Sequence, residues 1–287
     1  MMRTSDEVFP ALPKGLEMPF YYASLSSLWV YYQVDLESAR RHVAAAPGLE
    51  LALFDGVPAA ALNFQRYTSH GDSFLKTTTE VEFNLLACPA AGVPSAPALS
   101  LGAWLAGDDA TRTIGQLRLQ VAADNEFAVW AGQELFGEPK FYTTFTYRVP
   151  SLNARDTTAW DIRINEPSAD GAKPPDDRFI CRITADLTGL PMRAANLSPL
   201  AKWSVLRGRT VQTQWNLLGA WQGARVLQDQ RERFSLSTGG STARMAREIS
   251  ELLLGAPPVA VHLFESQPVA AETRGFFIAP PSDRSGS

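Results

Sequence analysis

The chain has 287 residues, of which 45% are hydrophobic, so it is long enough to bury a sizeable core. Its formal net charge is −4 at pH 7. We therefore expect neither a nucleic-acid partner nor an anionic membrane surface, because both select for a basic face. Small molecules are the partners that this composition favours.

The sequence shows no targeting or membrane signal. No run approaches the roughly 18 to 20 apolar residues of a membrane-spanning helix, and the start, MMRTSDEVFPALPKG, lacks the apolar segment of a signal peptide. A cytoplasmic protein without a membrane partner is predicted. Cys88 and Cys181 lie far apart within apolar runs, so we expect buried free thiols. The histidines stand singly and predict no metal site: His42, His70 and His262.

The first part of the chain is predicted to form strands with one capped helix. Residues 28–35, LWVYYQVD, have the aromatic and β-branched composition of a strand, and Asp35 is placed to cap the helix that follows. Asp55 and Gly56 separate two apolar runs, which predicts a β-hairpin. Residues 77–88 alternate between an apolar face and a second face that carries Glu80, Glu82, Asn84 and Leu86.

Further elements follow an Ala/Pro-rich loop that begins at Pro89. A strand over 113–122, a helix over 128–136 and a strand over 141–150 are predicted. The polar loop at 166–177 could separate two domains, but strand-like runs resume directly after it. We therefore predict one domain over 17–279, between an N-terminal segment, 1–16, and a flexible tail, 280–287.

These elements predict an α+β fold. About ten strand-like runs accompany three or four short helices, which is typical of a mainly antiparallel, barrel-like β-sheet. In a barrel, the polar face of an alternating strand can line an enclosed cavity instead of facing bulk water. Glu82 and Asn84 could meet a ligand in that way.

One motif is more specific than the rest of the sequence. In AGQELFGEPKFY, residues 131–142, Lys140 follows a proline and lies among aromatic residues, where a lysine either snorkels or is used chemically. The stretch resembles the signature of the acetoacetate decarboxylase family, A-G-G-R-E-hydrophobic-aromatic-G-aromatic-P-K-K. The resemblance covers about residues 20 to 150. The matching positions are Ala131, Gly132, Glu134, Leu135, Phe136, Gly137, Pro139 and Lys140.

The resemblance implies a role for Lys140. In the family, the lysine amine condenses with a substrate ketone, and the protonated imine withdraws electrons from the bond that breaks. The reaction needs a neutral amine, and apolar surroundings would lower the pKa of Lys140 by desolvation. No metal or organic cofactor is implied, because the imine is the electron sink. The resemblance also suggests a cone-like sheet and a homo-oligomer.

The chain departs from the family pattern around this lysine. Phe141 replaces the second lysine, which leaves burial or an arginine elsewhere to tune the amine. The family's arginine aligns with Leu25 and one acidic position with Asn63. The other acidic position aligns with Glu82, or with Asn84 if the register slips. We predict Lys140 and Glu82 as catalytic residues, and Asn63, Asn84, Phe141 and Tyr142 as substrate-binding residues.

Two functions are compatible with these features. The resemblance predicts a Schiff-base-forming lyase that acts on a small oxo acid or ketone through Lys140, by decarboxylation or by an aldol/dehydration step, with Glu82 as acid/base group. The changed positions also fit a non-catalytic small-molecule binding protein that kept the barrel and its cavity.

Overall fold

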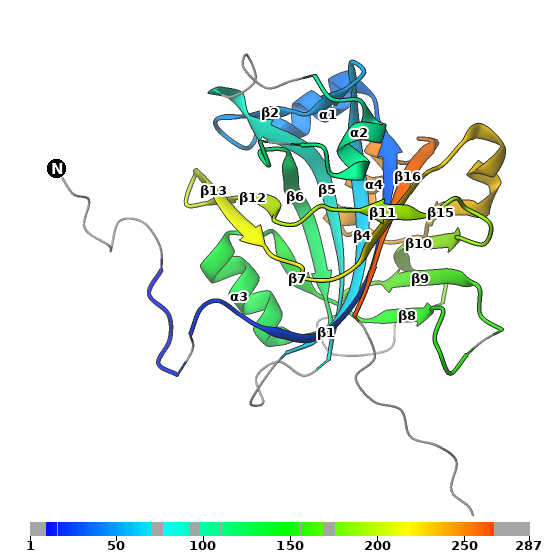
Figure 1. The fold of residues 1–287 in the computed structure, drawn as a ribbon. Coiled ribbons are helices and arrows are strands. Elements are labelled where there is room, and N and C mark those ends of the chain that lie inside the picture. Colours follow the sequence, from blue (N-terminus) through cyan, green and yellow to red (C-terminus); the bar gives the residue numbers. More distant parts are fainter. Residues whose placement is uncertain are drawn as a thin grey trace, which may run out of the picture.

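The structure is a computed structural model that describes residues 10–15, 17–69, 77–91, 98–109, 111–154, 156–168 and 176–266. Within these ranges the strands form two sheets (Figure 1). The predicted tail, 280–287, and most of the predicted N-terminal segment lie outside the described residues.

The larger sheet has twelve strands. Its main path of neighbours runs β11 (Arg193–Ala195), β14 (Trp221–Arg225), β16 (Pro258–Glu265), β1 (Tyr22–Gln33), β4 (Val57–Ser69), β5 (Thr78–Pro89), β6 (Gly115–Ala123), β12 (Leu200–Leu206) and β13 (Arg209–Trp215). Three short strands pair beside this path: β2 (Leu49–Leu51), β3 (Leu53–Phe54) and β7 (Lys140–Tyr142). The smaller sheet has the order β15 (Phe234–Thr238), β10 (Phe179–Asp186), β9 (Ala159–Asn165) and β8 (Phe145–Arg148).

The helices are short. The described residues contain α1 (Leu36–Val43), α2 (Leu101–Ala106), α3 (Glu126–Phe136), α4 (Arg244–Leu252) and a 3-10 turn over Gln228–Arg233. Helices α1, α2 and α3 begin at side-chain caps. The Asp35 carboxylate accepts a hydrogen bond from the backbone N–H of Ser38, which confirms the predicted cap of α1. Asp55 and Gly56 both have positive φ, as a tight β3–β4 hairpin requires.

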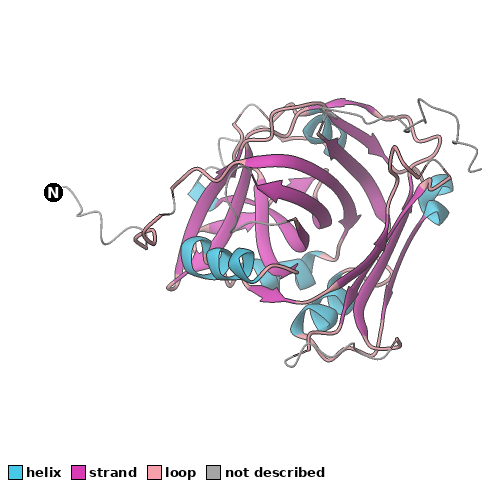
Figure 2. Ribbon diagram, turned by 90° about the horizontal axis from the view of Figure 1, so that it is seen from below, coloured by secondary structure: helices cyan, strands magenta, loops and turns pink. Residues whose placement is uncertain are grey.

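The larger sheet is buried on both faces. The apolar residues of β5, such as Val81 and Phe83, join a core with the smaller sheet, α1 and α4. The opposite face carries an aromatic core that includes Trp29, Tyr31 and Trp104. The predicted second face of β5 points to this side, and Glu80, Glu82 and Asn84 are buried there. Figure 2 shows how strongly the larger sheet curves around this face.

The predicted mainly antiparallel fold with a few short helices is confirmed, but the predicted barrel is not closed within the described part of the chain. In the described residues the path of strand pairing ends at β11 and at β13, so the sheet is curved but open. Strand β6 also pairs parallel with β12 through residues 115–117 and parallel with β7 through residues 121–123. Helix α3 is the crossover that allows β7 to lie parallel to β6. Strand β12 reaches β6 only after strands β8 to β11.

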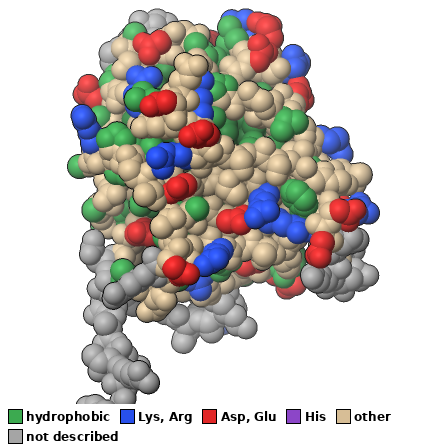
Figure 3. All heavy atoms as spheres, turned by 90° about the vertical axis from the view of Figure 1, so that its right-hand side faces the viewer, with side chains coloured by type: hydrophobic (Ala, Val, Ile, Leu, Met, Phe, Trp, Pro, Cys, Tyr) green, Lys and Arg blue, Asp and Glu red, His purple; other side chains and the backbone are tan. Residues whose placement is uncertain are grey.

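Charges of both signs mix on one side of the molecule. Figure 3 shows acidic and basic side chains interspersed on the side of the molecule that carries the smaller sheet, where Arg182 pairs with Asp161 and Arg178 with Glu166. None of the helices in the described part of the chain has the length and apolar character to cross a membrane.

Candidate active site

A strand–helix–strand unit positions Lys140. Helix α3 begins after Asn125, whose side chain accepts hydrogen bonds from two backbone N–H groups, and it ends at Gly137 in the left-handed conformation, φ 67°. The Glu138 N–H then donates to the Gly132 carbonyl at 2.8 Å. This tight turn starts β7 at Lys140, opposite Val121 of β6. The turn therefore brings the lysine back over the polar face of the sheet.

The glycine of the motif makes room for the lysine side chain. A Cβ atom at Gly132 would lie 2.5 Å from Cδ of Lys140 and 2.9 Å from Oε2 of Glu138. Real Cβ atoms do not approach other atoms so closely. A glycine at this position of α3 is thus required by the path of the Lys140 side chain.

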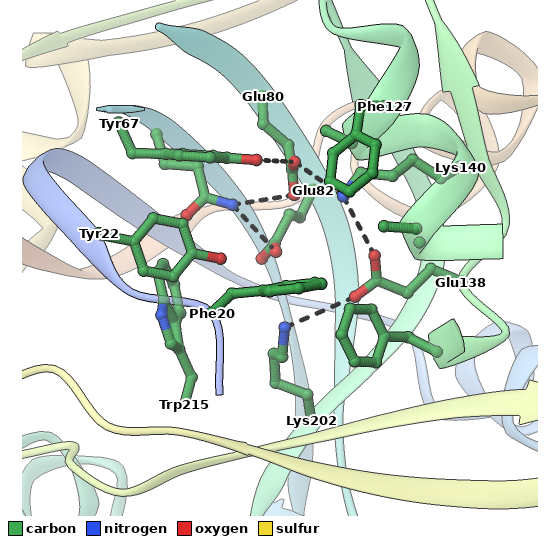
Figure 4. Close-up of a pocket in the computed structure, with 15 residues that line it drawn as sticks. Phe20, Tyr22, Tyr67, Glu80, Glu82, Phe127, Glu138, Lys140, Lys202 and Trp215 are labelled. Carbon is green, nitrogen blue, oxygen red and sulfur yellow. Dashed lines mark hydrogen bonds and ion pairs between the residues drawn. The ribbon is translucent and has the colours of Figure 1, made fainter. Parts of the chain in front are cut away.

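The Lys140 amine lies between two carboxylates. Its side chain is 7% exposed, and Nζ lies 2.8 Å from Oε2 of Glu80 and 3.2 Å from Oε2 of Glu138. Tyr67 donates to the same Glu80 oxygen, and Gln65 donates to the other. Figure 4 shows these groups converging from β4, β5 and β7. The arrangement is a buried ion-pair cluster.

The carboxylates decide the charge of this lysine. Burial lowers the pKa of Lys140, but the charges of Glu138 and Glu80 outweigh burial, and the pKa lies above its ordinary value. Burial raises the pKa of Glu138, but Lys140, Lys202 and Arg118 outweigh it and hold the pKa well below the usual range. The expectation of a lowered lysine pKa is therefore wrong, because it considered desolvation without the neighbouring anions.

Glu82 is held by a ring of donors. Asn63 donates to its Oε2 at 2.7 Å and Gln65 to its Oε1 at 3.2 Å. Arg118 Nη2 lies 2.5 Å from the same Oε1. Burial raises the pKa of Glu82, and Arg118 opposes that shift without cancelling it. Glu82 is 1% exposed, so its contacts are protein groups and the cavity.

Arg118 reaches this face because of a β-bulge. The pairing of β5 with β6 shifts between Phe83 and Asn84, so that Asn84 faces Arg118 while Glu82 faces Val121. One extra residue in β6 reverses which side chains point to the polar face. Without the bulge, strict alternation would place Arg118 and Val121 on opposite faces.

A second lysine comes from the other half of the chain. Lys202 of β12 places Nζ 3.6 Å from Oε1 of Glu138. The same amine lies 5.8 Å from the ring centre of Phe136 and 5.6 Å from a ring centre of Trp215. Both distances are in the range of cation–π contacts. A cationic neighbour thus exists, although it is not adjacent to Lys140 in sequence.

The charged groups surround a small inner cavity of about 40 Å³. It is lined by three glutamates, two lysines and mainly aromatic and small residues: Phe20, Tyr22, Gln65, Tyr67, Glu80, Glu82, Phe127, Ala128, Ala131, Gly132, Phe136, Glu138, Lys140, Lys202 and Trp215. Lysine and carboxyl groups around one small cavity can stabilise a cationic intermediate and exchange protons with a ligand.

Solved structures with the same fold were found by comparison. An acetoacetate decarboxylase from Legionella pneumophila is 12% identical, with a TM-score of 0.55 over 92% of this chain and 93% of that chain. The enduracididine biosynthesis enzyme MppR, in complex with the condensation product of pyruvate and imidazole 4-carboxaldehyde, is 15% identical, with a TM-score of 0.53 over 87% and 86%. An acetoacetate decarboxylase-like enzyme from Sphingomonas wittichii is 14% identical, with a TM-score of 0.51 over 86% and 89%.

The chain has the acetoacetate decarboxylase-like fold. No family model matches the sequence, and no curated protein matches it. At these identities the likeness is one of fold.

Within the acetoacetate decarboxylase-like fold, the predicted site residues separate into three groups. Lys140 and Glu82 both line the inner cavity. Asn63 and Asn84 are buried beside it and donate to Glu82 instead of lining it. The aromatic pair that follows the lysine does not line the cavity, since Phe141 packs against the core shared with the smaller sheet and Tyr142 is exposed.

Several site residues were missed by the sequence reasoning. Glu80 shares the predicted face of β5 with Glu82, so the alternation was enough to propose it. Glu138 stands where the family pattern has an aromatic residue, and a change from aromatic to acidic two positions before the lysine was a usable signal. Arg118 and Lys202 had no local signal, because a bulge and a long-range parallel pairing bring them in.

Proposed function

We propose that this protein is a Schiff-base-forming lyase that acts on an oxo acid or ketone through Lys140. The observation that carries the proposal is the buried Lys140 amine within 3.2 Å of two carboxylates at a small cavity. The acetoacetate decarboxylase-like fold supports it. Decarboxylation and an aldol or dehydration step both proceed from the same imine.

The chemistry assigned to these groups is simple. The neutral Nζ of Lys140 attacks the carbonyl carbon, the carbonyl oxygen leaves as water, and a protonated imine forms. The electron pair of a bond from the α-carbon, to a carboxylate carbon or to hydrogen, becomes the second bond between the α-carbon and the imine carbon, and the C=N π pair moves onto nitrogen. Carbon dioxide leaves, or Glu82 takes up the proton, and a neutral enamine remains. Glu80 and Glu138, which stabilise the ammonium in the free protein, would stabilise the equally cationic imine.

Glu82 is the proposed proton carrier. Its pKa is raised by burial, and it lines the cavity, so it can hold a proton in the neutral range more readily than an exposed glutamate. Asn63 and Asn84 are proposed to position this carboxyl group through their amide donors. For Phe141 and Tyr142, a contact with the substrate is proposed from the sequence alone.

The raised pKa of Lys140 has a consequence for the rate. The ammonium must lose its proton before attack, so the fraction of reactive amine rises with pH throughout the neutral and mildly alkaline range. We expect imine formation to accelerate from pH 7 to pH 9. An amine with a lowered pKa would instead reach a plateau below pH 8.

Reductive trapping tests the proposal. The protein is incubated with pyruvate, acetoacetate or acetone, reduced with borohydride, and examined by intact mass and peptide mapping. We expect one adduct on the peptide that contains Lys140, and none in Lys140→Met. The exposed Lys14 provides a matched control, because Lys14→Met removes a lysine that does not line the cavity. No adduct with any of these carbonyl compounds, at pH 7 or pH 9, would refute the proposal.

A second candidate is a small-molecule binding protein with the same cavity. The observation that favours it is the doubly ion-paired ammonium, which is well suited to hold its charge and poorly suited to attack. Calorimetry distinguishes the two. Binding of an oxo acid that survives in Lys140→Arg, together with the absence of any trapped adduct in the unaltered protein, would favour the binding protein.

A further inference from the structure

A second, larger cavity adjoins the inner one. Its volume is about 600 Å³, within the range of about 300 to 1,000 Å³ that is typical of ligand pockets. Five residues line both cavities: Phe20, Tyr22, Phe136, Lys202 and Trp215. These shared walls make the two spaces neighbouring compartments of one site, which we call the inner and the outer cavity.

The two cavities differ in size and in chemistry. The inner cavity, about 40 Å³, has room for little more than the volume of one water molecule, about 30 Å³, and so for a carbonyl group and its nearest atoms. Its walls carry Glu80, Glu82 and Lys140. The outer cavity contains none of these charged groups, and among its lining residues in the described part of the chain only Lys202 is charged.

Apolar and aromatic side chains dominate the outer cavity. Leu25, Leu217 and Phe264 form buried parts of its wall. Two further apolar side chains there are open to solvent, Tyr21 at 69% and Leu218 at 89% exposure. When a ligand covers exposed apolar groups beside a concave surface, removal of these groups from water favours binding. The lining therefore fits an apolar occupant.

An unused donor lies at the boundary between the cavities. Trp215 lines both of them and is largely buried, and its indole N–H has no hydrogen-bond partner among the described residues. A buried donor without a partner costs free energy until an acceptor arrives. The Lys202 amine lies beside the same ring. A carboxylate near the reacting carbonyl would meet the Lys202 amine there, beside the Trp215 ring.

We propose that the substrate is a carbonyl compound with a large apolar or aryl tail, such as a 2-oxo acid with an arylalkyl group. The carbonyl enters the inner cavity, the acceptor group lies at Lys202, beside Trp215, and the tail fills the outer cavity. This inference rests on the proposed function for the reaction at Lys140. The preferred substrate is then longer than the small oxo acid that the sequence led us to expect.

Paired ligands test the inference. Pyruvate and 2-oxo-4-phenylbutanoate are trapped with borohydride over a range of concentrations, and the adduct at Lys140 is quantified. We expect half-maximal labelling at a concentration of the phenyl compound about tenfold or more below that of pyruvate, because burial of the ring adds apolar contact. Equal concentrations for the two acids would overturn the inference.

A variant that fills the outer cavity tests the position of the tail, and a matched substitution beside it serves as the control. Thr213 lies on β13, lines the outer cavity and does not line the inner one. Thr213→Trp should reduce the preference for the phenyl compound to about one. The adjacent Gln212 is exposed and lines neither cavity, so Gln212→Trp should keep the preference. An unchanged preference in Thr213→Trp would contradict a tail in the outer cavity.

Two further measurements distinguish a failure of this inference from a failure of the proposed imine mechanism. Calorimetry with the phenyl compound reports binding without labelling, so binding that Thr213→Trp abolishes in the absence of any adduct would support the cavity assignment and refute the imine mechanism. Light scattering reports the oligomeric state. A dimer that Thr213→Trp dissociates, together with no advantage of the phenyl compound, would show that a second copy covers the outer cavity and would overturn the inference.

Discussion

Two buried regions on the same face of the larger sheet treat a titratable side chain in opposite ways. His262 of β16 lies among aromatic rings, with Nε2 2.9 Å from the Leu105 carbonyl oxygen and Nδ1 3.1 Å from the Tyr31 hydroxyl. Burial lowers the pKa of His262 to about 4. Lys140 is also buried, but its pKa is raised by two carboxylates. Burial alone therefore does not determine the charge of a side chain in this protein.

The comparison indicates which region is built for chemistry. The carbonyl oxygen of Leu105 can only accept, so Nε2 of His262 donates and Nδ1 accepts from Tyr31. Both ring nitrogens are thus satisfied within the protein, and aromatic rings fill the space around them. The Lys140 region instead keeps an inner cavity among its charges. A satisfied and filled region stabilises the fold, whereas a charged region with a cavity can bind and react.

The largest predicted effect comes from removal of the lysine charge. Lys140→Met leaves Glu80 and Glu138 buried without their shared cation, so we expect loss of the borohydride adduct and a decrease of about 3 to 5 kcal/mol in the free energy of unfolding at pH 7. The decrease should shrink as the pH falls toward 4, because protonated carboxyl groups need no cation. Urea denaturation at pH 7 and pH 4 measures both. Equal destabilisation at the two pH values would contradict the ion-pair account.

The second predicted effect is the contribution of His262 to the pH dependence of the free energy of unfolding. The folded pKa of His262 is about 4 and lies below the unfolded value near 6.5, so the unfolded chain binds the proton more readily. Its contribution, up to about 3 kcal/mol, is complete above pH 6.5 and is lost as the pH falls toward 4. His262→Gln should flatten the stability profile between pH 6.5 and 4. An unchanged slope in this variant would place the pH sensitivity elsewhere.

The third effect tests the glycine of the motif. Gly132→Ala forces Lys140 and Glu138 to move, so we expect about 1 to 3 kcal/mol of destabilisation and at least about a tenfold slower adduct formation. Gly102→Ala is the control, since its Cβ would meet other atoms only at 3.8 Å and beyond, and alanine favours a helix. Unaltered trapping in Gly132→Ala would show that the lysine side chain has another path.

The smallest effect changes the charge around the lysine without removing it. Glu138→Gln removes one anion, so the pKa of Lys140 should fall by about one unit, and adduct formation at pH 7 should become about tenfold faster. Glu134→Gln, an exposed residue of the same helix, is the control. The pH dependence of trapping measures the shift. A slower reaction at pH 7 with no shift of the profile would assign Glu138 to a direct step.

The sequence predicted the strand face and the turn that carry the site better than it predicted which charged residues meet there. Alternation in β5 assigned the correct face to Glu82, and the motif identified the turn that carries Lys140. The identity of the neighbouring charges depended on pairing between distant strands. Arg118 depends on a bulge, and Lys202 on the parallel pairing of β12 with β6. Neither contact leaves a periodic pattern in a single sequence.

Two other expectations concerned features that depend on the three-dimensional arrangement of the strands, namely the aromatic residues of β7 and the closure of the barrel. The assignment of Phe141 and Tyr142 to the substrate stays a prediction; neither lines the inner cavity, since Phe141 packs against the core and Tyr142 is exposed. The barrel was expected from the number of strands, whereas closure depends on whether the edge strands pair. The homo-oligomer and the single-domain boundaries stay predictions.

The exchange of the carbonyl oxygen with water tests imine formation at Lys140 most directly. Each cycle of imine formation and hydrolysis replaces that oxygen with one from solvent, whatever bond breaks afterwards. In ¹⁸O-labelled water, the account predicts that the protein accelerates label uptake by 2-oxo-4-phenylbutanoate above the spontaneous rate, more at pH 9 than at pH 7, and that Lys140→Met does not. Uptake at the spontaneous rate with the unaltered protein would contradict it.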